Sequence, residues 1–382
     1  MMKKIWPFSF YFLTFAAMAS LLPFFVIFYQ GLGFSGTEIG LLTGVPPLIT
    51  LFGAPFGTGL ADRTHRHKLI MSIGLISAVV MAILLPSLKG FVIIFGIIAL
   101  YNLFMAPVGS LADSATMGML GGERAMYGRI RLGGTLGWAI LAPVAGWLVQ
   151  QYGLRIAFWL FASITLINFF VSQKFDFGKQ DAHESENGGI RDLLSNRSWI
   201  FFLLASLVGG VGTLSVSSYL YPYMAEIGAN ESQMGIAALI ATMTELPIFF
   251  FGDRLVKRFG SYTLFMAALV LLGLRSLMFA WASTTWMVYV VQALGGMMFP
   301  AMWLAGVSYA DENAPAGLKS TGQGLFSAMC FGFGSAVGGF VGGILLERVG
   351  GHSMFFVLGL VILASLLLIE VAKRIFPAKE MS

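Results

Sequence analysis

The sequence predicts an all-α membrane protein with twelve transmembrane helices in two pseudo-symmetric six-helix bundles. Three observations support this prediction: an apolar composition, twelve apolar runs of membrane-spanning length, and short echoes between the two halves. Of the 382 residues, 57% are hydrophobic and 11% are charged, whereas soluble domains carry about 25% charged residues. The mean hydropathy of +0.83 indicates that most of the surface faces lipid.

A helix needs about 20 apolar residues to cross a bilayer. In the first half, runs bounded by glycine, proline or charge lie at 6–29, 38–60, 69–88, 90–117, 125–150 and 153–172. In the second half they lie at 198–224, 231–251, 261–282, 285–310, 317–346 and 352–374. The first run follows two lysines, as in a signal peptide, but it is long enough to span the membrane. No A-x-A cleavage site follows a short core, so we expect this run to be retained as a helix.

One long polar segment, 173–197, is rich in Lys, Asp, Glu, Asn and Gly. It predicts a hydrated cytoplasmic linker between an N-terminal bundle at 1–172 and a C-terminal bundle at 198–382.

Two echoes relate the halves. The run 148–153 aligns with 345–350 at an offset of 197 residues, and the Ala-Asp-Arg of 61–63 is answered by the Gly-Asp-Arg of 252–254. Such short echoes can arise by chance in an apolar chain, but two at nearly the same offset favour an internal repeat.

Lysine and arginine are distributed asymmetrically. With the N-terminus inside, 18 of the 23 basic residues fall in cytoplasmic segments and three fall outside. Because cytoplasmic loops carry the excess of basic residues, we expect both termini in the cytoplasm and the protein in the cell membrane. The pI of about 9.3 then reflects topology, and no nucleic-acid partner is expected.

Several chemistries are not expected. Cys330 is the one cysteine, so there is no internal disulfide or thiolate metal cluster, and no Walker A lysine loop suggests an ATP-driven pump. No enzymatic activity, cofactor or metal is expected, apart from a proton as coupling ion. The histidines all fall in predicted loops: His65, His67, His183 and His352.

Four ionisable residues lie deep inside the predicted helices, away from their ends: Asp113, Arg131, Glu245 and Arg275. Each charge costs roughly 2.5–3.5 kcal/mol at the centre of a membrane helix on insertion scales. Because such residues usually mark the path of a solute or a proton, we expect a membrane transporter.

One face of the run 125–150 carries polar chemistry. Arg131, Thr135 and Trp138 are spaced i, i+4 and i+7, which aligns a cation, a hydroxyl and an aromatic face. An arginine opposite Asp113 can bind vicinal hydroxyls, and a Trp face can cover a sugar ring. Asn102 lies 11 residues before Asp113, about three turns, on the same helix face. Alternatively, Asp113 and Arg131 form a solvated structural ion pair at the helix ends.

The segment 60–68 reads Leu-Ala-Asp-Arg-Thr-His-Arg-His-Lys. It resembles the loop motif G-x-L-A-D-R-x-G-R-K of the major facilitator superfamily, whose architecture has two six-helix repeats. The resemblance implies that Asp62 and Arg63 form a conformational latch. Thr58 and His65 replace motif glycines, which leaves open whether the tight turn is kept.

The segment 127–138 reads Tyr-Gly-Arg-Ile-Arg-Leu-Gly-Gly-Thr-Leu-Gly-Trp, with Asp113 18 residues before Arg131. This resembles the proton-coupled lactose permease group. The resemblance implies that Asp113 and Arg131 bind substrate hydroxyls and that Trp138 stacks on a pyranose ring. The segment is also similar to phenylpropionate permeases and nucleoside–proton symporters.

The segment 242–245, Thr-Met-Thr-Glu, resembles the T-M-G-E of lactose permease helix 8, and Arg275 matches its helix 9 arginine. Glu245 is therefore expected to carry the coupling proton, under the influence of Arg275. The alternative is a permanent Glu245–Arg275 ion pair that fixes helix packing.

The helix 10 proton relay of that group is missing. Gln292, Gly295 and Met298 stand where the group carries Lys, His and Glu. If transport is driven by protons, Glu245 or Asp113 must carry the proton.

Taken with these residues, the sequence predicts a monomeric symporter that imports a small hydroxylated solute, a sugar by preference, with protons by alternating access. An aromatic acid or a nucleoside stays open as the solute. Efflux by proton antiport also stays open, because 142–146 faintly resembles the G-P-x-x-G-G antiporter motif. A membrane scaffold or sensor without transport is disfavoured by the four retained charges.

Overall fold

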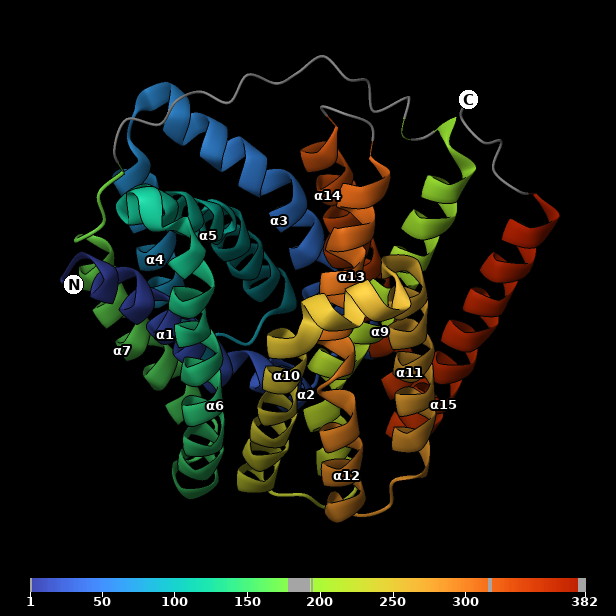
Figure 1. Cartoon of the computed structure of the whole chain (residues 1–382). Helices are drawn as coiled ribbons and strands as arrows, with labels where there is room; N and C mark the ends of the chain where they lie inside the picture. The colour runs from blue at the N-terminus through green and yellow to red at the C-terminus, as the bar shows by residue number, and fades with distance from the viewer. Residues whose placement is uncertain (1, 178–192, 194, 315–317, 377–382) are drawn as a thin grey trace. The chain divides into compact units, whose positions relative to one another are not determined.

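The computed structural model describes residues 2–177, 193, 195–314 and 318–376. Every regular element within these ranges is a helix, which confirms the predicted all-α class (Figure 1). Most of the predicted linker, at 178–192 and 194, lies outside the described residues.

The described residues fall into two compact units. The first lies within Met1–Ala182 and Ala229–Thr242, and the second within His183–Gly228 and Met243–Ser382. Helix α10 (Glu231–Phe259) is therefore shared: its first part belongs to the first unit and its remainder to the second.

The helices of the first unit follow one another with short connections. They are α1 (Met2–Leu21), α2 (Phe25–Gly31), α3 (Gly36–Thr64), α4 (His67–Leu84), α5 (Phe91–Leu120), α6 (Tyr127–Tyr152) and α7 (Arg155–Ser172). The second unit continues with the rest of α10 and with α9 (Arg197–Glu226), α11 (Ser261–Trp281), α12 (Thr285–Gly295), α13 (Met298–Asn313), α14 (Lys319–Ser327) and α15 (Ser335–Ile375).

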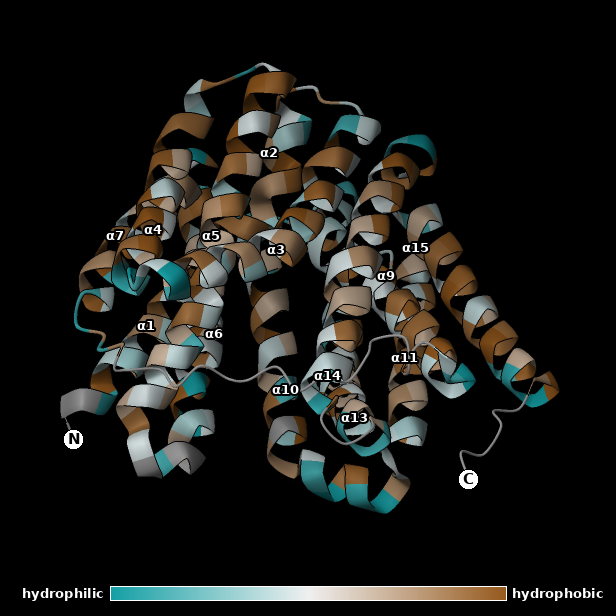
Figure 2. Ribbon diagram, turned by 90° about the horizontal axis from the view of Figure 1, so that it is seen from above, coloured by the Kyte–Doolittle hydropathy of each residue, from teal (hydrophilic) through white to brown (hydrophobic). Residues whose placement is uncertain are grey.

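The helices are long and apolar enough to cross a membrane. The described residues contain ten such spans and an eleventh that is bent. Large apolar side chains are exposed on them, including Val92 at 78% and Leu368 at 68%, and apolar residues dominate the helices in Figure 2. Exposed apolar surface on this scale is expected where the protein faces lipid rather than water.

The last span, Lys319–Ile375, contains two crossings. Its 57 residues would form a helix about 85 Å long, whereas the hydrocarbon core is about 30 Å thick. The helix breaks at Gly350, where φ is 73° and ψ is 170°. The backbone N–H of Gly351 donates to the Glu226 carboxylate at 2.7 Å, which supplies a partner at the break. Counting two crossings here gives the predicted twelve.

Most predicted helix boundaries agree with the structure to within a few residues, but α10 does not end at 251. It runs on to Phe259 with a bend of 58° between Glu231–Ile248 and Phe250–Phe259. Pro247 lies at this bend. Proline removes a backbone hydrogen bond and kinks a helix, which accounts for the bend.

Polar side chains set where several helices begin. Ser35 and Glu38 form a reciprocal capping box at the start of α3. The side chain of Asn196 accepts from the N–H of Ser198 at 2.9 Å at the start of α9. These caps satisfy N–H groups that the first turn of a helix leaves unpaired.

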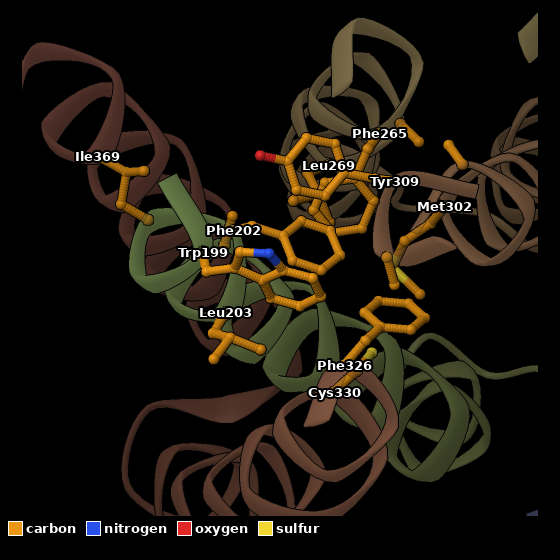
Figure 3. Close-up of a cluster of buried hydrophobic side chains, with 14 of the residues drawn as sticks. Trp199, Phe202, Leu203, Phe265, Leu269, Met302, Tyr309, Phe326, Cys330 and Ile369 are labelled. Atoms are coloured by element: carbon orange, nitrogen blue, oxygen red, sulfur yellow. The ribbon is translucent and has the colours of Figure 1, made fainter. Parts of the chain in front are cut away.

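An aromatic cluster forms the core of the second unit (Figure 3). The ring of Phe202 lies 4.4 Å from Tyr309 and 5.1 Å from Phe265, measured between centroids. Buried Trp199 joins the cluster and donates its indole N–H to the carbonyl of Asn313 at 2.9 Å. These contacts tie α9, α11 and α13 together.

Two glycines let α6 and α10 meet backbone to backbone within the first unit. A Cβ on Gly146 would lie 2.4 Å from the carbonyl oxygen of Glu231, and one on Gly235 would lie 2.5 Å from that of Ala142. Small residues are what permits such close helix approach in membranes.

The turn between α3 and α4 keeps the conformation that a glycine would adopt. His65 has φ 54° and ψ 28°, which is left-handed, and it is the one non-glycine residue with positive φ among those described. The substitution of the motif glycine has therefore left the tight turn in place, at the cost of a conformation that L-residues disfavour.

We expect His65→Gly to stabilise the protein by up to about 1 kcal/mol. The substitution removes a left-handed penalty of roughly 1–2 kcal/mol, and the greater freedom of glycine in the unfolded chain offsets part of this gain. Unfolding in detergent measures the change. His65→Asn should lie close to the wild type and His65→Val well below it. A His65→Gly protein less stable than His65→Val would contradict the assignment of strain to this turn.

Candidate functional site

Asp113, on α5, is held by two tyrosines from other helices. The hydroxyl groups of Tyr11 on α1 and Tyr127 on α6 both donate to its Oδ1, the second at 2.9 Å. Hydrogen bonds to an ionised carboxylate are stronger than bonds between neutral groups. The phenols can therefore satisfy Asp113 inside the bundle without a cation.

Arg131, on α6, rests on aromatic rings. Its guanidinium carbon lies 4.4 Å from the ring centroid of Phe15 and 5.0 Å from that of Tyr11, so ring quadrupoles stabilise its charge. A Cβ on Gly134 would lie 2.8 Å from Nη1 of Arg131 and 3.0 Å from Phe15. The glycine thus leaves space for the arginine and its aromatic support.

Tyr11 connects the two charged groups, since its hydroxyl binds Asp113 while its ring lies beneath Arg131. In the described chain, no ion pair of 4.0 Å or less joins Asp113 to Arg131. The structure does not form the direct structural pair that the sequence left open. Helix α6 begins at Tyr127 rather than 125, so Arg131 lies little more than one turn inside it.

The other residues predicted for this site lie on the same two helices. Thr135 and Trp138 are both partly buried on α6. Asn102 is partly buried on α5, but its amide donates to the carbonyl of Ile98 at 2.8 Å. One side of that amide is therefore engaged with its own helix.

In the second unit, Arg275 on α11 is 9% exposed. Its Nη2 donates to Oε1 of Gln292 on α12, and its guanidinium carbon lies 5.3 Å from the ring centroid of Phe279. Its Nε is buried and has no hydrogen-bond partner among the described residues. Gln292 departs from the lactose permease pattern, whereas Arg275 matches it. The structure thus pairs the departing residue with the matching arginine.

Glu245 is partly buried on the part of α10 that belongs to the second unit. Over the described residues it makes no ion pair of 4.0 Å or less with Arg275, although the two charges interact electrostatically. The permanent ion pair considered from the sequence is not formed. Thr242, three residues earlier, bonds the carbonyl of Ala238 at 2.8 Å.

The predicted latch residues lie at the end of α3. The carboxylate of Asp62 lies 2.8 Å from Nε2 of His67, while Arg63 is exposed. The His67 ring stacks on Phe177 with centroids 5.5 Å apart. Asp62, in the last turn of α3, is thus paired with the first residue of α4 in this structure.

Sequence reasoning assigned no role to Tyr11, Tyr127 or Phe15, and it did not pair Gln292 with Arg275. Tyr11 lies 102 residues from Asp113, so no spacing rule links them. Tyr127 opens the segment that resembles the lactose permease group, and its place there was a usable signal for a donor near Arg131.

The twelve crossings counted over the described residues and the division into two compact units define a multi-pass membrane transporter of the major facilitator class. The chain belongs to the MFS_1 like family, whose model matches residues 5–357. It is a transporter and not an enzyme.

Similar proteins span nearly the whole chain. Maltose permease of Geobacillus stearothermophilus is 28% identical over 378 residues, covering 97% of this chain and 95% of the relative. Multidrug resistance protein MdtG of Citrobacter koseri is 26% identical over 373 residues, covering 92% and 90%. The crystal structure of nucleoside transporter NupG shares the fold, with a TM-score of 0.83 at 19% identity over 97% of this chain and 99% of that one.

We expect the two phenols to act together on Asp113. Tyr11→Phe and Tyr127→Phe should each lower the free energy of unfolding by about 1 kcal/mol, because each removes one donor and leaves the other. The double variant should lose more than the sum, since Asp113 then keeps neither phenol. Unfolding in mixed micelles measures this, with exposed Tyr152→Phe as the control. Additive losses would show that the phenols act independently.

Proposed function

We propose that this transporter is a symporter that imports a small hydroxylated solute, a sugar by preference, together with protons by alternating access. The observation that carries the proposal is the group on α5 and α6, where Asp113 and Arg131 are stabilised without a mutual ion pair. The similarity to a protein named maltose permease supports a sugar as the solute.

The chemistry of this group suits a neutral polyol. One carboxylate and one guanidinium offer acceptors and donors to hydroxyl groups. Because Asp113 and Arg131 form no ion pair with each other, both can bind a solute hydroxyl in place of water without breaking a salt bridge. Thr135 adds a hydroxyl, Trp138 adds a ring face for the apolar side of a sugar, and Asn102 adds its amide oxygen.

Glu245 is the proposed proton carrier, and Arg275 is its electrostatic partner. When a carboxylate in a buried salt bridge takes up a proton, its partner cation is left buried without a counter-charge, and this costs free energy. Within the part of the chain that the structure describes, Glu245 has no such bridge. Arg275 has neutral partners, Gln292 and Phe279, whose own charge does not change when Glu245 is protonated. Asp62 and Arg63 are proposed to latch one conformation on the cytoplasmic side.

Proton antiport of a drug or metabolite is the second candidate, because MdtG proteins share similar identity over most of the chain. A nucleoside or an aromatic acid is the alternative solute, since the segment 127–138 is similar to transporters of both kinds. The two directions of proton movement separate symport from antiport.

We expect a sugar to drive protons into proteoliposomes that contain the purified protein. Maltose, lactose, uridine and phenylpropionate are added outside in turn, and a trapped dye records the internal pH. Symport predicts that the lumen acidifies when the transported solute is added. Alkalinisation of the lumen would instead support antiport, and silence with every solute would remove the proposal.

Arg131→Ala should abolish the response while leaving folded protein. The matched control is Arg155→Ala, which removes an exposed arginine at the start of α7. A full response in Arg131→Ala would remove Arg131 from the solute site.

Glu245→Gln should uncouple transport from the proton gradient. An amide keeps the shape of the side chain but cannot load and release a proton, so exchange of labelled solute should persist while accumulation against a gradient is lost. The exposed Glu347→Gln serves as the control. Undiminished accumulation in Glu245→Gln would assign the proton to another group, with Asp113 next to test.

A further inference from the structure

The guanidinium of Arg275 is enclosed by neutral groups of the second unit. It donates to the side-chain oxygen of Gln292 and lies over the ring of Phe279. Its Nε is buried and without a hydrogen-bond partner among the described residues. A cation inside a membrane protein usually finds a carboxylate or water, so this enclosure needs a reason.

Gly295 is what makes the enclosure possible. It lies three residues after Gln292 on α12, and its own position is buried. A Cβ at 295 would lie 2.1 Å from Nε, 2.3 Å from Cζ and 2.7 Å from Cδ of Arg275. Side-chain atoms cannot approach so closely, so the guanidinium occupies the space that any side chain at 295 would fill.

We propose that Gly295 and Gln292 are positioning residues for Arg275, holding its guanidinium on α12 by space and by a neutral acceptor so that it does not close an ion pair with Glu245. This inference rests on the proposed function, in which Glu245 exchanges a proton near Arg275. Both positions depart from the lactose permease pattern. Where that pattern has residues of its proton relay, Gln292 supplies a hydrogen-bond acceptor and Gly295 supplies space for the guanidinium of Arg275, and we call this pair the arginine seat.

Neutrality at position 292 is the chemical point of this arrangement. A carboxylate there would form a charge-assisted pair with Arg275 and neutralise it. The amide of Gln292 accepts the same hydrogen bond without neutralising the guanidinium, so the positive charge still acts on Glu245. Among the described residues, the charged group that interacts electrostatically with Glu245 is Arg275, and the one that interacts with Arg275 is Glu245.

The first unit contains a related arrangement in which the glycine and the ring exchange places: there the glycine is on the arginine's own helix, α6, and the ring is on α1, whereas in the second unit the ring is on the arginine's own helix, α11, and the glycine is on α12. Arg131 lies against Gly134 and over Phe15, as Arg275 lies against Gly295 and over Phe279. In both units a glycine and an aromatic ring hold an arginine that makes no direct pair with its neighbouring carboxylate. Two arginines held by a glycine and a ring support a positioning role for the close contact at Gly295.

A double-mutant cycle on thermal stability tests the seat without any solute. Gly295→Ala should lower the unfolding temperature in detergent by about 3 °C or more, because the new methyl group displaces a buried guanidinium. In an Arg275→Ala background the same change should be neutral or stabilising, since the space is empty and alanine favours a helix. Gly324→Ala, with open space around its Cβ position, is the matched control. Equal losses in both backgrounds would overturn the seat.

Transport tests the positioning role, with radiolabelled maltose followed in both accumulation and exchange. Gln292→Glu should keep the hydrogen bond and the unfolding temperature but lower accumulation by about tenfold or more relative to exchange. Gly295→Ala should show the same split. Full accumulation in both variants, with loss in Arg275→Ala, would overturn the positioning role and leave the proposed function standing. Full accumulation in Arg275→Ala would instead overturn the proposed role of Arg275. Absence of maltose transport in the wild type would count against the sugar proposal. In that case the double-mutant cycle on stability still tests whether Gln292 and Gly295 hold Arg275.

Discussion

The cost of placing charge in a membrane is the constraint on which the rest of this structure depends. An unpaired ionised group inside hydrocarbon is expensive, and direct ion pairs are the obvious remedy. The structure uses another one. Phenol hydroxyls bind Asp113, aromatic faces support Arg131 and Arg275, and an amide oxygen accepts from Arg275. Each charge is stabilised by neutral groups, so each stays available for a solute or a proton.

Glycine serves this constraint as much as polar residues do. At Gly134 and Gly295 the absence of a side chain makes room for a guanidinium, whereas at Gly146 and Gly235 it lets two helix backbones meet. At Gly350 positive φ breaks a helix that is too long for one crossing. The 47 glycines of the chain therefore include positions with quite different physical roles, which composition alone does not separate.

The twelve crossings could be predicted from the sequence because a lipid solvent demands long apolar runs, and that signal is local. The face of α6 that carries Arg131, Thr135 and Trp138 could also be predicted, since helical periodicity places those residues together. The contact between Asp113 and Tyr11 could not be predicted, because the two residues are 102 positions apart and only tertiary packing joins them. The continuation of α10 was missed for a different reason: the charged residues after 251 suggested the end of the helix, whereas the helix bends and runs on to Phe259.

The distribution of charge also constrains how a proton could be coupled to movement. Asp113 and Arg131 balance each other in the first unit, and Glu245 and Arg275 carry opposite charge in the second. On the proposed coupling, a proton on Glu245 leaves the charge of Arg275 uncompensated within the membrane. That state is disfavoured unless water or a rearrangement stabilises the guanidinium. An arginine already held by Gln292 and Phe279 reduces this cost without removing it, and the remainder is the free energy by which protonation can favour one conformation over another.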